Sequence, residues 1–304
     1  MSLYQKYRPT TLQMVKGNEH IISTLDGMLS NLETCPHTFL LHGGSGCGKT
    51  TIGRIIAERV GCKGADFREI NASDDTGIDG VREIIKNSNY LPMQGDARVW
   101  LVDECHRWTT NAQDSVLKIL EDTPSHVYFI LCTTEPTKLK TTIRSRCSEF
   151  QVKPLTDDQM KGLLKRIVKA EGNSLEQEVY DQIIQDSLGH PRRAIVTLEQ
   201  VLNVDEDKRL EVAKKTAELQ SQTIELCRAL LKPNNAWQPI RVILNALQEQ
   251  DPEDIRRAVM GYCKAVLLKS DNEKAGLILD FFCEPFYNSG FPGVVHACYS
   301  IVKA

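Results

Sequence analysis

The most constraining feature of this 304-residue sequence is a glycine-rich loop at residues 43–50, between a short apolar run and a helix-patterned segment. Gly43, Gly48, Lys49 and Thr50 satisfy the pattern G-x-x-x-x-G-K-[ST] in that context. Glycines let successive backbone N–H groups wrap around a polyphosphate, and the following helix adds the positive end of its dipole. The stretch therefore predicts a nucleoside triphosphate site rather than a plain turn. The expected binding residues are Gly43, Gly44, Ser45, Gly46, Cys47, Gly48, Lys49, Thr50 and Thr51.

Two carboxylates at the end of a second apolar run indicate which reaction to expect at this site. Residues 99–103 read VWLVD, so Asp103 and Glu104 emerge where a buried strand ends, which is where open parallel sheets bind their ligands. We expect Lys49 to meet the β and γ phosphates of ATP, and Thr50 and Asp103 to hold Mg²⁺. Glu104 would orient and polarise the attacking water, which favours hydrolysis over mere binding. An ordinary helix N-cap is the alternative for the acidic pair.

The first half of the chain has the pattern of a parallel α/β sheet. Helix-patterned segments separate short β-rich runs, and several of these runs are apolar almost throughout, as expected for strands that are covered on both faces. The five expected strands are residues 38–42, 67–72, 99–103, 127–133 and 148–152.

The character of the sequence changes after Pro154, beyond which we expect only helices. A polar joint at residues 203–207 separates a shorter helical part from a longer one. We therefore expect an α/β nucleotide-binding domain at residues 1–153, a small helical domain at 154–205 and a larger all-helical domain at 206–304. Expected helices in the small domain cover residues 157–170, 176–188 and 193–202, and the expected breaks in the larger domain are Pro233, Pro252 and a turn at residues 290–293.

Bulk composition is that of a folded globular protein. Hydrophobic residues make up 41% and charged residues 25% of the chain, and no apolar run approaches the roughly 20 residues that a membrane span needs. The N-terminus has no apolar stretch behind a basic start, so we expect a cytoplasmic protein, or a nuclear one in a eukaryote, with no membrane contact. The net charge of -3 excludes no nucleic-acid partner, because it averages over faces. The ten cysteines include no C-x-x-C pair and favour reduced thiols over zinc.

Four further stretches carry a resemblance to a known family. They are YRPTTLQMVKGNEHI, INASDDTGIDGVREIIK, DECHRWTTNAQDSVLKILEDTPSHVYFILCTTEPTKL and the SRC triplet at residues 145–147. Through them, roughly the first 205 residues resemble the AAA+ ATPase subunits of DNA sliding-clamp loaders, both replication factor C small subunits and the bacterial gamma/tau type. The resemblance implies an AAA+ fold with a five-stranded parallel sheet, a helical lid and an all-α collar that joins subunits. It also implies that the N-terminal segment wraps the adenine, through Tyr7, Arg8, Pro9, Val15 and Gly17.

The sequence departs from the bacterial gamma pattern in one respect. That form carries a zinc module with clustered cysteines between the phosphate loop and the acidic strand, and nothing similar occurs between Cys62 and Cys105. This difference favours a replication factor C-like or phage-like loader.

The resemblance assigns three further residues to ATP hydrolysis. Thr134 is expected to hydrogen-bond the attacking water or the γ-phosphate, as sensor 1. Arg146 would enter the site of a neighbouring subunit, where a guanidinium stabilises charge on the transferred phosphoryl group. Arg192 matches the sensor 2 arginine of GHPRRAIVTLEQ, with Arg193 as the other register, and would let nucleotide state set the interdomain angle. The alternatives are a strand-capping threonine, a surface salt bridge and an exposed helix arginine, respectively.

The resemblance also implies partners. Loaders cage primer-template DNA inside a spiral of five subunits and contact its backbone phosphates, so Arg82, Lys86 and Arg107 are candidate DNA contacts, with a solvated helix face as the alternative. Asn71 matches a polar switch residue that holds the catalytic glutamate idle. The apolar residues 90–93 are either a contact for the sliding clamp or an inward-facing helix end.

The leading hypothesis is a Mg·ATP-hydrolysing subunit of a sliding-clamp loader. One alternative is another AAA+ machine acting on DNA, such as a helicase loader or a branch-migration motor. A nucleotide-dependent scaffold is disfavoured because Glu104, Thr134 and Arg146 are all present. A small-molecule kinase is disfavoured because the sequence shows no acceptor site. That hypothesis would also leave the helical half of the chain unexplained.

Overall fold

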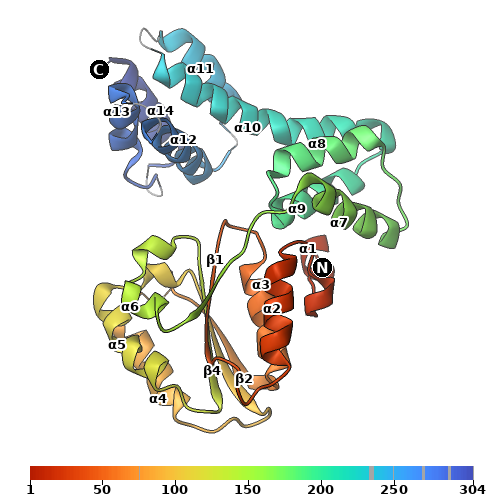
Figure 1. Ribbon diagram of the computed structural model, residues 1–304. Coiled ribbons are helices and arrows are strands. Elements are labelled where there is room, and N and C mark those ends of the chain that lie inside the picture. The colour runs from red at the N-terminus through yellow and green to blue at the C-terminus, as the bar shows by residue number, and fades with distance from the viewer. Residues whose placement is uncertain (75, 233–235, 249, 269–270, 287–288, 304) are drawn as a thin grey trace. The chain divides into compact units, whose positions relative to one another are not determined.

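The computed structural model describes residues 1–303 except 75, 233–235, 249, 269–270 and 287–288 (Figure 1). The chain divides into two compact units, Met1–Glu206 and Asp207–Ala304. The expected division of the first unit between residues 153 and 154 stays a prediction.

The first unit is built on a five-stranded parallel sheet with the strand order β2-β3-β4-β1-β5. All five expected strands are therefore confirmed. Strand β2 begins earlier than expected, because the chain already pairs with β3 at Cys62, before a register irregularity that ends at Phe67. The strands are β1 (Thr38–His42), β2 (Cys62–Asn71), β3 (Ala97–Asp103), β4 (Val127–Thr133) and β5 (Ser148–Gln151).

Helices cover both faces of this sheet, which explains the apolar runs (Figure 1). Every residue of β4 is buried. Because successive side chains of a strand point to opposite faces, Ile130 joins the core beneath α2 (Glu19–Leu29) and α3 (Lys49–Arg59). Phe129 joins the core on the other face, beneath α4 and α5. Each such buried side chain contributes roughly 1.5–3 kcal/mol. The helices of the second face are α4 (Ile78–Ser88), α5 (Thr110–Glu121) and α6 (Thr141–Arg144).

Three helices complete the first unit after the sheet, and they confirm the expected helical segments. Helix α7 begins at a capping box, in which Thr156 and Gln159 satisfy each other's backbone N–H groups. Proline at the first position of α9 fits a helix start, since its missing N–H has no helical partner there. These helices are α7 (Asp157–Ala170), α8 (Gln177–Ser187) and α9 (Pro191–Leu202), and the short N-terminal helices are α1 (Leu3–Lys6) and η1 (Leu12–Met14).

The second unit contains only helices among its described residues, around one apolar core. Pro252 begins α12, as expected for a break at that position. The turn expected at residues 290–293 is wrong, because Gly290 starts α14 and the following residues form its first turn. The break expected at Pro233 lies outside the described residues. The helices are α10 (Arg209–Leu231), α11 (Trp237–Ala246), α12 (Pro252–Leu267), α13 (Glu273–Phe282) and α14 (Gly290–Lys303), preceded by η4 (Glu206–Lys208).

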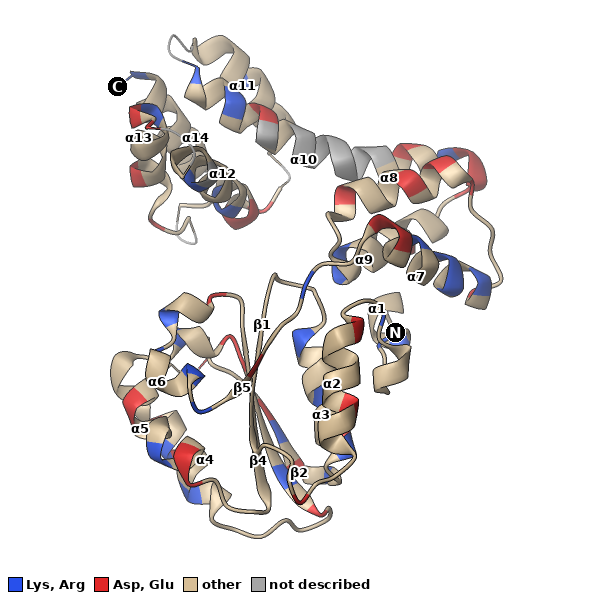
Figure 2. Ribbon diagram, in the orientation of Figure 1, with Lys and Arg blue, Asp and Glu red and all other residues tan. Residues whose placement is uncertain are grey.

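Charged side chains lie mainly on helices and loops, and strand β4 carries none (Figure 2). Among the described residues, no helix is long and apolar enough to cross a membrane.

Candidate nucleotide-binding site

The glycine-rich loop connects β1 to the first turn of α3 and depends on backbone shapes that favour glycine. Gly43 has φ +150°, and a Cβ there would lie 2.1 Å from the carbonyl oxygen of Val152. Gly48, with φ +103°, occupies the position just before α3. The side chain of Lys49 is only 5% exposed and donates to the carbonyl oxygens of Gly43 and Gly44, both at 3.0 Å. The ammonium group is thus held at the mouth of the loop, where phosphate oxygens would be its natural acceptors.

The two expected magnesium ligands lie side by side. The hydroxyl of Thr50 donates to Oδ2 of Asp103 at 2.8 Å, and Oδ1 of Asp103 accepts from the backbone N–H of Glu104 at 3.0 Å. A hydroxyl oxygen and a carboxylate oxygen are hard donors of the kind that Mg²⁺ takes together with phosphate oxygens. The donor set therefore fits a magnesium ion bound with a nucleotide.

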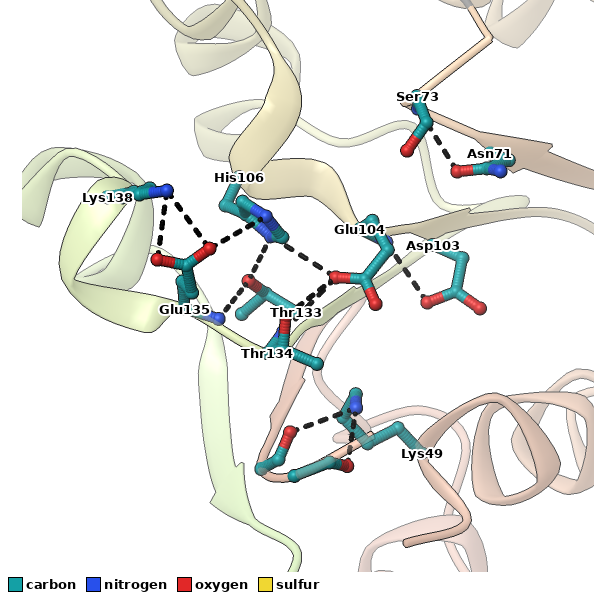
Figure 3. A network of polar contacts seen from close by, with 12 residues as sticks. Lys49, Asn71, Ser73, Asp103, Glu104, His106, Thr133, Thr134, Glu135 and Lys138 are labelled. Atoms are coloured by element: carbon teal, nitrogen blue, oxygen red, sulfur yellow. Dashed lines mark hydrogen bonds and ion pairs between the residues drawn. The ribbon is translucent and has the colours of Figure 1, made fainter. Parts of the chain in front are cut away.

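Glu104 occupies a strained position between β3 and the short helix η2 (Cys105–Arg107). Its backbone has φ 50°, in the left-handed region that a non-glycine residue adopts at a cost of order 1–3 kcal/mol. Its Oε2 accepts from the hydroxyl of Thr134 at 3.0 Å and from the backbone N–H of the same residue at 3.4 Å (Figure 3). The structure thus brings the expected catalytic carboxylate and the expected sensor 1 threonine together.

A histidine that the sequence reasoning missed completes this cluster. The Nδ1 atom of His106 lies 3.2 Å from Oε2 of Glu104 and 2.9 Å from the hydroxyl oxygen of Thr133. Its Nε2 lies 3.4 Å from Oε1 of Glu135, whose carboxylate also pairs with Lys138 at 2.9 Å (Figure 3). The only signal in the sequence is the histidine of DECH, two positions after the catalytic glutamate.

The surroundings shift the pKa values of two groups in this cluster. Burial lowers the pKa of His106, although the carboxylates of Glu104 and Glu135 act in the opposite direction. The hydrogen bond from Lys138 holds the pKa of Glu135 below its usual value. At neutral pH the imidazole is therefore neutral and the carboxylate is charged.

A cavity beside the phosphate loop brings together most of the residues expected around the adenine. Its walls come from the N-terminal segment, the glycine-rich loop, α7 and α9. Gly17 does not line this cavity. A Cβ at this position, where φ is +70°, would lie 2.5 Å from a side-chain carbon of Leu155, so there is no room for a larger residue. The lining residues that were expected to bind nucleotide are Tyr7, Arg8, Pro9, Val15, Gly46, Cys47, Gly48 and Thr51.

Arg192 of α9 reaches this same region and contacts Tyr4. Its Nη2 donates to the Tyr4 hydroxyl at 3.1 Å, and its guanidinium carbon lies 4.9 Å from the ring centroid. Burial would raise the pKa of Tyr4, but the hydrogen bond and charge of Arg192 lower it overall. Arg193 instead acts on Asp186 of α8, where its charge opposes the rise in carboxyl pKa that burial causes. Of the two possible registers, Arg192 is the one that contacts Tyr4, a residue of the cavity wall.

Arg146 makes its side-chain contacts away from the glycine-rich loop. Its guanidinium pairs with Glu121 of α5 at 2.6 Å and donates to the carbonyl oxygen of Thr142 at 2.9 Å. The chain therefore holds this arginine at its own surface.

The candidate DNA contacts and the polar switch residue are exposed. Arg82 pairs with Asp79 at 3.1 Å on the same helix, and Lys86 and Arg107 are exposed. Asn71 ends strand β2, and its side-chain oxygen accepts from the backbone N–H of Ser73 at 3.0 Å (Figure 3). Among the described contacts, Glu104 is held by Thr134 and His106 rather than by Asn71.

The apolar loop after α4 points outward and has a buried support. Leu91 is 72% and Met93 is 82% exposed. Asp66, only 1% exposed, accepts from the backbone N–H groups of residues 93, 94 and 95 at distances between 2.7 and 3.1 Å. Of the two expectations for this loop, the inward-facing helix end is wrong for Leu91 and Met93.

Strand β1, the glycine-rich loop and α3 form a P-loop, and the acidic end of β3 lies beside it. In the sheet, β4 lies between β3 and β1. These features define a P-loop nucleotide-binding protein of the AAA+ type. Known sequences agree, since the family described as DNA polymerase III, delta subunit matches residues 63–156, and DNA polymerase III subunit gamma/tau of Mycobacterium bovis is 35% identical over 225 residues. The chain is therefore similar in sequence to subunits of bacterial DNA polymerase III, in agreement with its AAA+ architecture.

Other relatives set the extent of the similarity. DNA polymerase III subunit gamma of Buchnera aphidicola subsp. Schizaphis graminum is 33% identical over 67% of this chain and 62% of its own length. The tau subunit of Bacillus subtilis is 29% identical over 88% of this chain. The aligned region covers 66% of this chain but only 39% of the Mycobacterium bovis protein. These relatives are bacterial, so the expected preference for a replication factor C-like or phage-like branch gains no support from them.

Among solved structures, the RuvB Holliday junction branch migration motor of Thermotoga maritima has a similar fold. The TM-score is 0.60 at 19% identity, over 79% of this chain and 85% of the motor. At that identity the likeness concerns the fold alone, and it confirms the AAA+ architecture.

Proposed function

We propose that this chain is an ATPase subunit of a DNA sliding-clamp loader, which uses binding and hydrolysis of Mg·ATP to open a clamp and load it onto primer-template DNA during replication. The observation that carries the proposal is the joined set of Thr50, Asp103, Glu104 and Thr134 at one end of the sheet. The similarity to gamma and tau subunits of DNA polymerase III supports clamp loading as the process that uses this ATP hydrolysis.

The phosphates of ATP are bound by the glycine-rich loop. Its backbone N–H groups and the N-terminus of α3 surround the β-phosphate, and Lys49 exchanges its two carbonyl acceptors for phosphate oxygens. Thr50 and Asp103 hold Mg²⁺, which neutralises charge on the phosphates when it is bound. The adenine enters the cavity lined by the N-terminal segment, where Tyr7 and Val15 contribute apolar surface.

Hydrolysis depends on Glu104 and on two arginines. Glu104 accepts a proton from the attacking water, and Thr134 orients either that water or the γ-phosphate. Arg192, on the lid, leaves Tyr4 to meet the γ-phosphate, so that nucleotide binding changes the position of α9. Arg146 acts in a neighbouring subunit after it exchanges Glu121 for the phosphoryl group, which couples hydrolysis to assembly.

Binding of partners uses other surfaces of the chain. Arg82, Lys86 and Arg107 contact the DNA backbone. Helix α4, which carries Arg82 and Lys86, also carries acidic residues (Figure 2). The exposed apolar residues 90–93 contact the clamp. Residues 1–153, 154–205 and 206–304 act as nucleotide-binding domain, lid and collar, and the collar joins subunits into a pentamer. The protein works where chromosomal DNA is replicated, which is the cytoplasm of a bacterium.

The test is the ATPase rate of the purified protein with and without primed DNA and the sliding clamp of the same genome. We expect the two additions together to raise the rate more than the sum of their separate effects. A rate that is indifferent to both would overturn the loader proposal. Movement of DNA strands driven by ATP without a clamp would favour a branch-migration motor instead.

A further inference from the structure

The contacts of His106 connect the catalytic glutamate to the loop after β4. The histidine lies between two carboxylates, with Nδ1 facing Oε2 of Glu104 at 3.2 Å and Nε2 facing Oε1 of Glu135 at 3.4 Å (Figure 3). Its side chain is only 6% exposed, so neither nitrogen can turn to water instead. Thr133, at the end of β4, lies 2.9 Å from Nδ1 and fixes the ring further.

A neutral imidazole carries one N–H and can therefore donate to only one of the two carboxylates. Glu135 already receives the ammonium group of Lys138 at 2.9 Å, whereas Glu104 has no lysine or arginine at salt-bridge distance among the described residues. The N–H is therefore better placed on Nδ1, where it donates to Glu104. The lone pair of Nε2 then faces a carboxylate whose charge Lys138 balances.

We propose that His106 is a positioning residue for ATP hydrolysis, which together with Thr134 fixes Oε2 of Glu104 and leaves Oε1 to accept the proton of the attacking water. This inference rests on the proposed ATPase function. It also gives the loop that follows β4 a direct connection to the catalytic carboxylate, because Glu135 and Lys138 determine which imidazole nitrogen carries the proton. Asn71, the expected partner of Glu104, bonds to Ser73 instead.

Protonation of His106 should slow the reaction. A charged imidazolium donates to both carboxylates and withdraws basicity from Glu104, which then accepts a proton from water less readily. The charged groups that face the ring are Glu104, Glu135, Lys138 and Arg107. Burial lowers the pKa of His106, so turnover should fall at a pH below the ordinary histidine value of about 6.5.

Two substitutions separate positioning from a merely structural role. In His106→Asn the amide nitrogen can occupy the place of Nδ1, whereas in His106→Gln it reaches the place of Nε2. We expect the Gln variant to lose about 10- to 100-fold in kcat with an unchanged Kd for ATP, and the Asn variant to recover most of that loss and to lack the acid limb of the wild-type pH profile. Equal rates in the two variants, or a Gln variant within two-fold of wild type, would overturn the proposal.

A spectroscopic measurement tests the contact without turnover. The pKa of His106, followed by NMR of the imidazole carbons, should be lower in Glu104→Gln than in wild type, because the carboxylate raises it. An unchanged pKa would refute the pairing. If the wild-type protein hydrolysed no ATP, the proposed function would fail while this titration still decided whether His106 holds Glu104.

Discussion

Thr50 donates its hydroxyl hydrogen to Oδ2 of Asp103 at 2.8 Å, across 53 positions of the sequence. The first turn of α3 and the end of β3 are thereby joined where Mg²⁺ is expected. We predict that Asp103→Asn raises the Mg²⁺ concentration for half-maximal ATP hydrolysis by at least about ten-fold, because a charged ligand becomes neutral. A magnesium titration of the ATPase rate measures this effect, and chelation with EDTA should abolish hydrolysis in the wild type.

The partly exposed carboxylate of Asp26 offers a matched control for that substitution. It pairs with Arg59 at 2.8 Å, and Asp26→Asn should leave the magnesium dependence unchanged. An Asp103→Asn variant with the wild-type magnesium curve would show that this carboxylate is no ligand.

Arg146 and Glu121 form an ion pair, and substitutions of these two residues should have different effects. Arg146→Ala should leave ATP binding to the isolated chain unchanged and lower hydrolysis in the assembled particle about 10³-fold, as loss of a trans arginine does in related chemistry. Glu121→Gln should change the free energy of unfolding by less than about 1 kcal/mol, because the pair is exposed. Calorimetric ATP binding and steady-state hydrolysis measure the effects of Arg146→Ala, and urea unfolding measures the effect of Glu121→Gln. Unimpaired turnover in an assembled Arg146→Ala particle would rule out the trans role.

Gly43 should be intolerant of any side chain. A Cβ at this position would lie 2.1 Å from the carbonyl oxygen of Val152, so Gly43→Ala should cost about 3 kcal/mol or more and distort the phosphate loop. Gly27 is the matched control, since it belongs to helix α2 and a Cβ there would meet no atom within 4 Å. Gly27→Ala should be neutral or stabilising by up to about 1 kcal/mol. Urea unfolding compares the two, and equal stability would contradict the close approach.

Asp66 should make the stability of the apolar loop depend on pH. Burial raises the pKa of its carboxyl, but the backbone N–H groups of Gln94, Met93 and Gly95 and the charge of Arg98 lower it overall. The charged form is therefore favoured in the folded state. Its contribution to the free energy of unfolding is present above the unfolded pKa of about 3.9 and is lost as the pH falls through the lower folded pKa.

Replacing this carboxylate should therefore lower the free energy of unfolding mainly above pH 4. Asp66→Asn should destabilise the protein by about 1–3 kcal/mol at neutral pH, because one oxygen acceptor is lost from a buried site. The difference from wild type should shrink toward pH 3. Denaturant unfolding at several pH values checks this, and a difference that grows on acidification would mean that the carboxylate does not stabilise the loop.

Much of the sheet could be predicted because β1, β3 and β4 are buried apolar runs, each with its own local signal. The start of β2 could not, since Lys63, Gly64 and Asp66 give it no strand pattern and its pairing comes from β3. The Thr50 and Asp103 contact followed from the fact that ligands bind at the carboxyl ends of parallel strands. The contact between His106 and Glu135 depends on β3 lying beside β4, and Glu121 meets Arg146 only through the fold. Neither contact can be inferred from the spacing of these residues in the sequence.

ATP hydrolysis should depend most on Glu104, the group that activates water. In Glu104→Gln the amide keeps the shape of the side chain but has no basic oxygen for the proton. We predict that this variant binds ATP and Mg²⁺ with the wild-type Kd and loses at least about 100-fold in the rate of hydrolysis under single-turnover conditions with primed DNA. A Glu104→Gln protein that binds ATP and hydrolyses it at the wild-type rate would contradict the account.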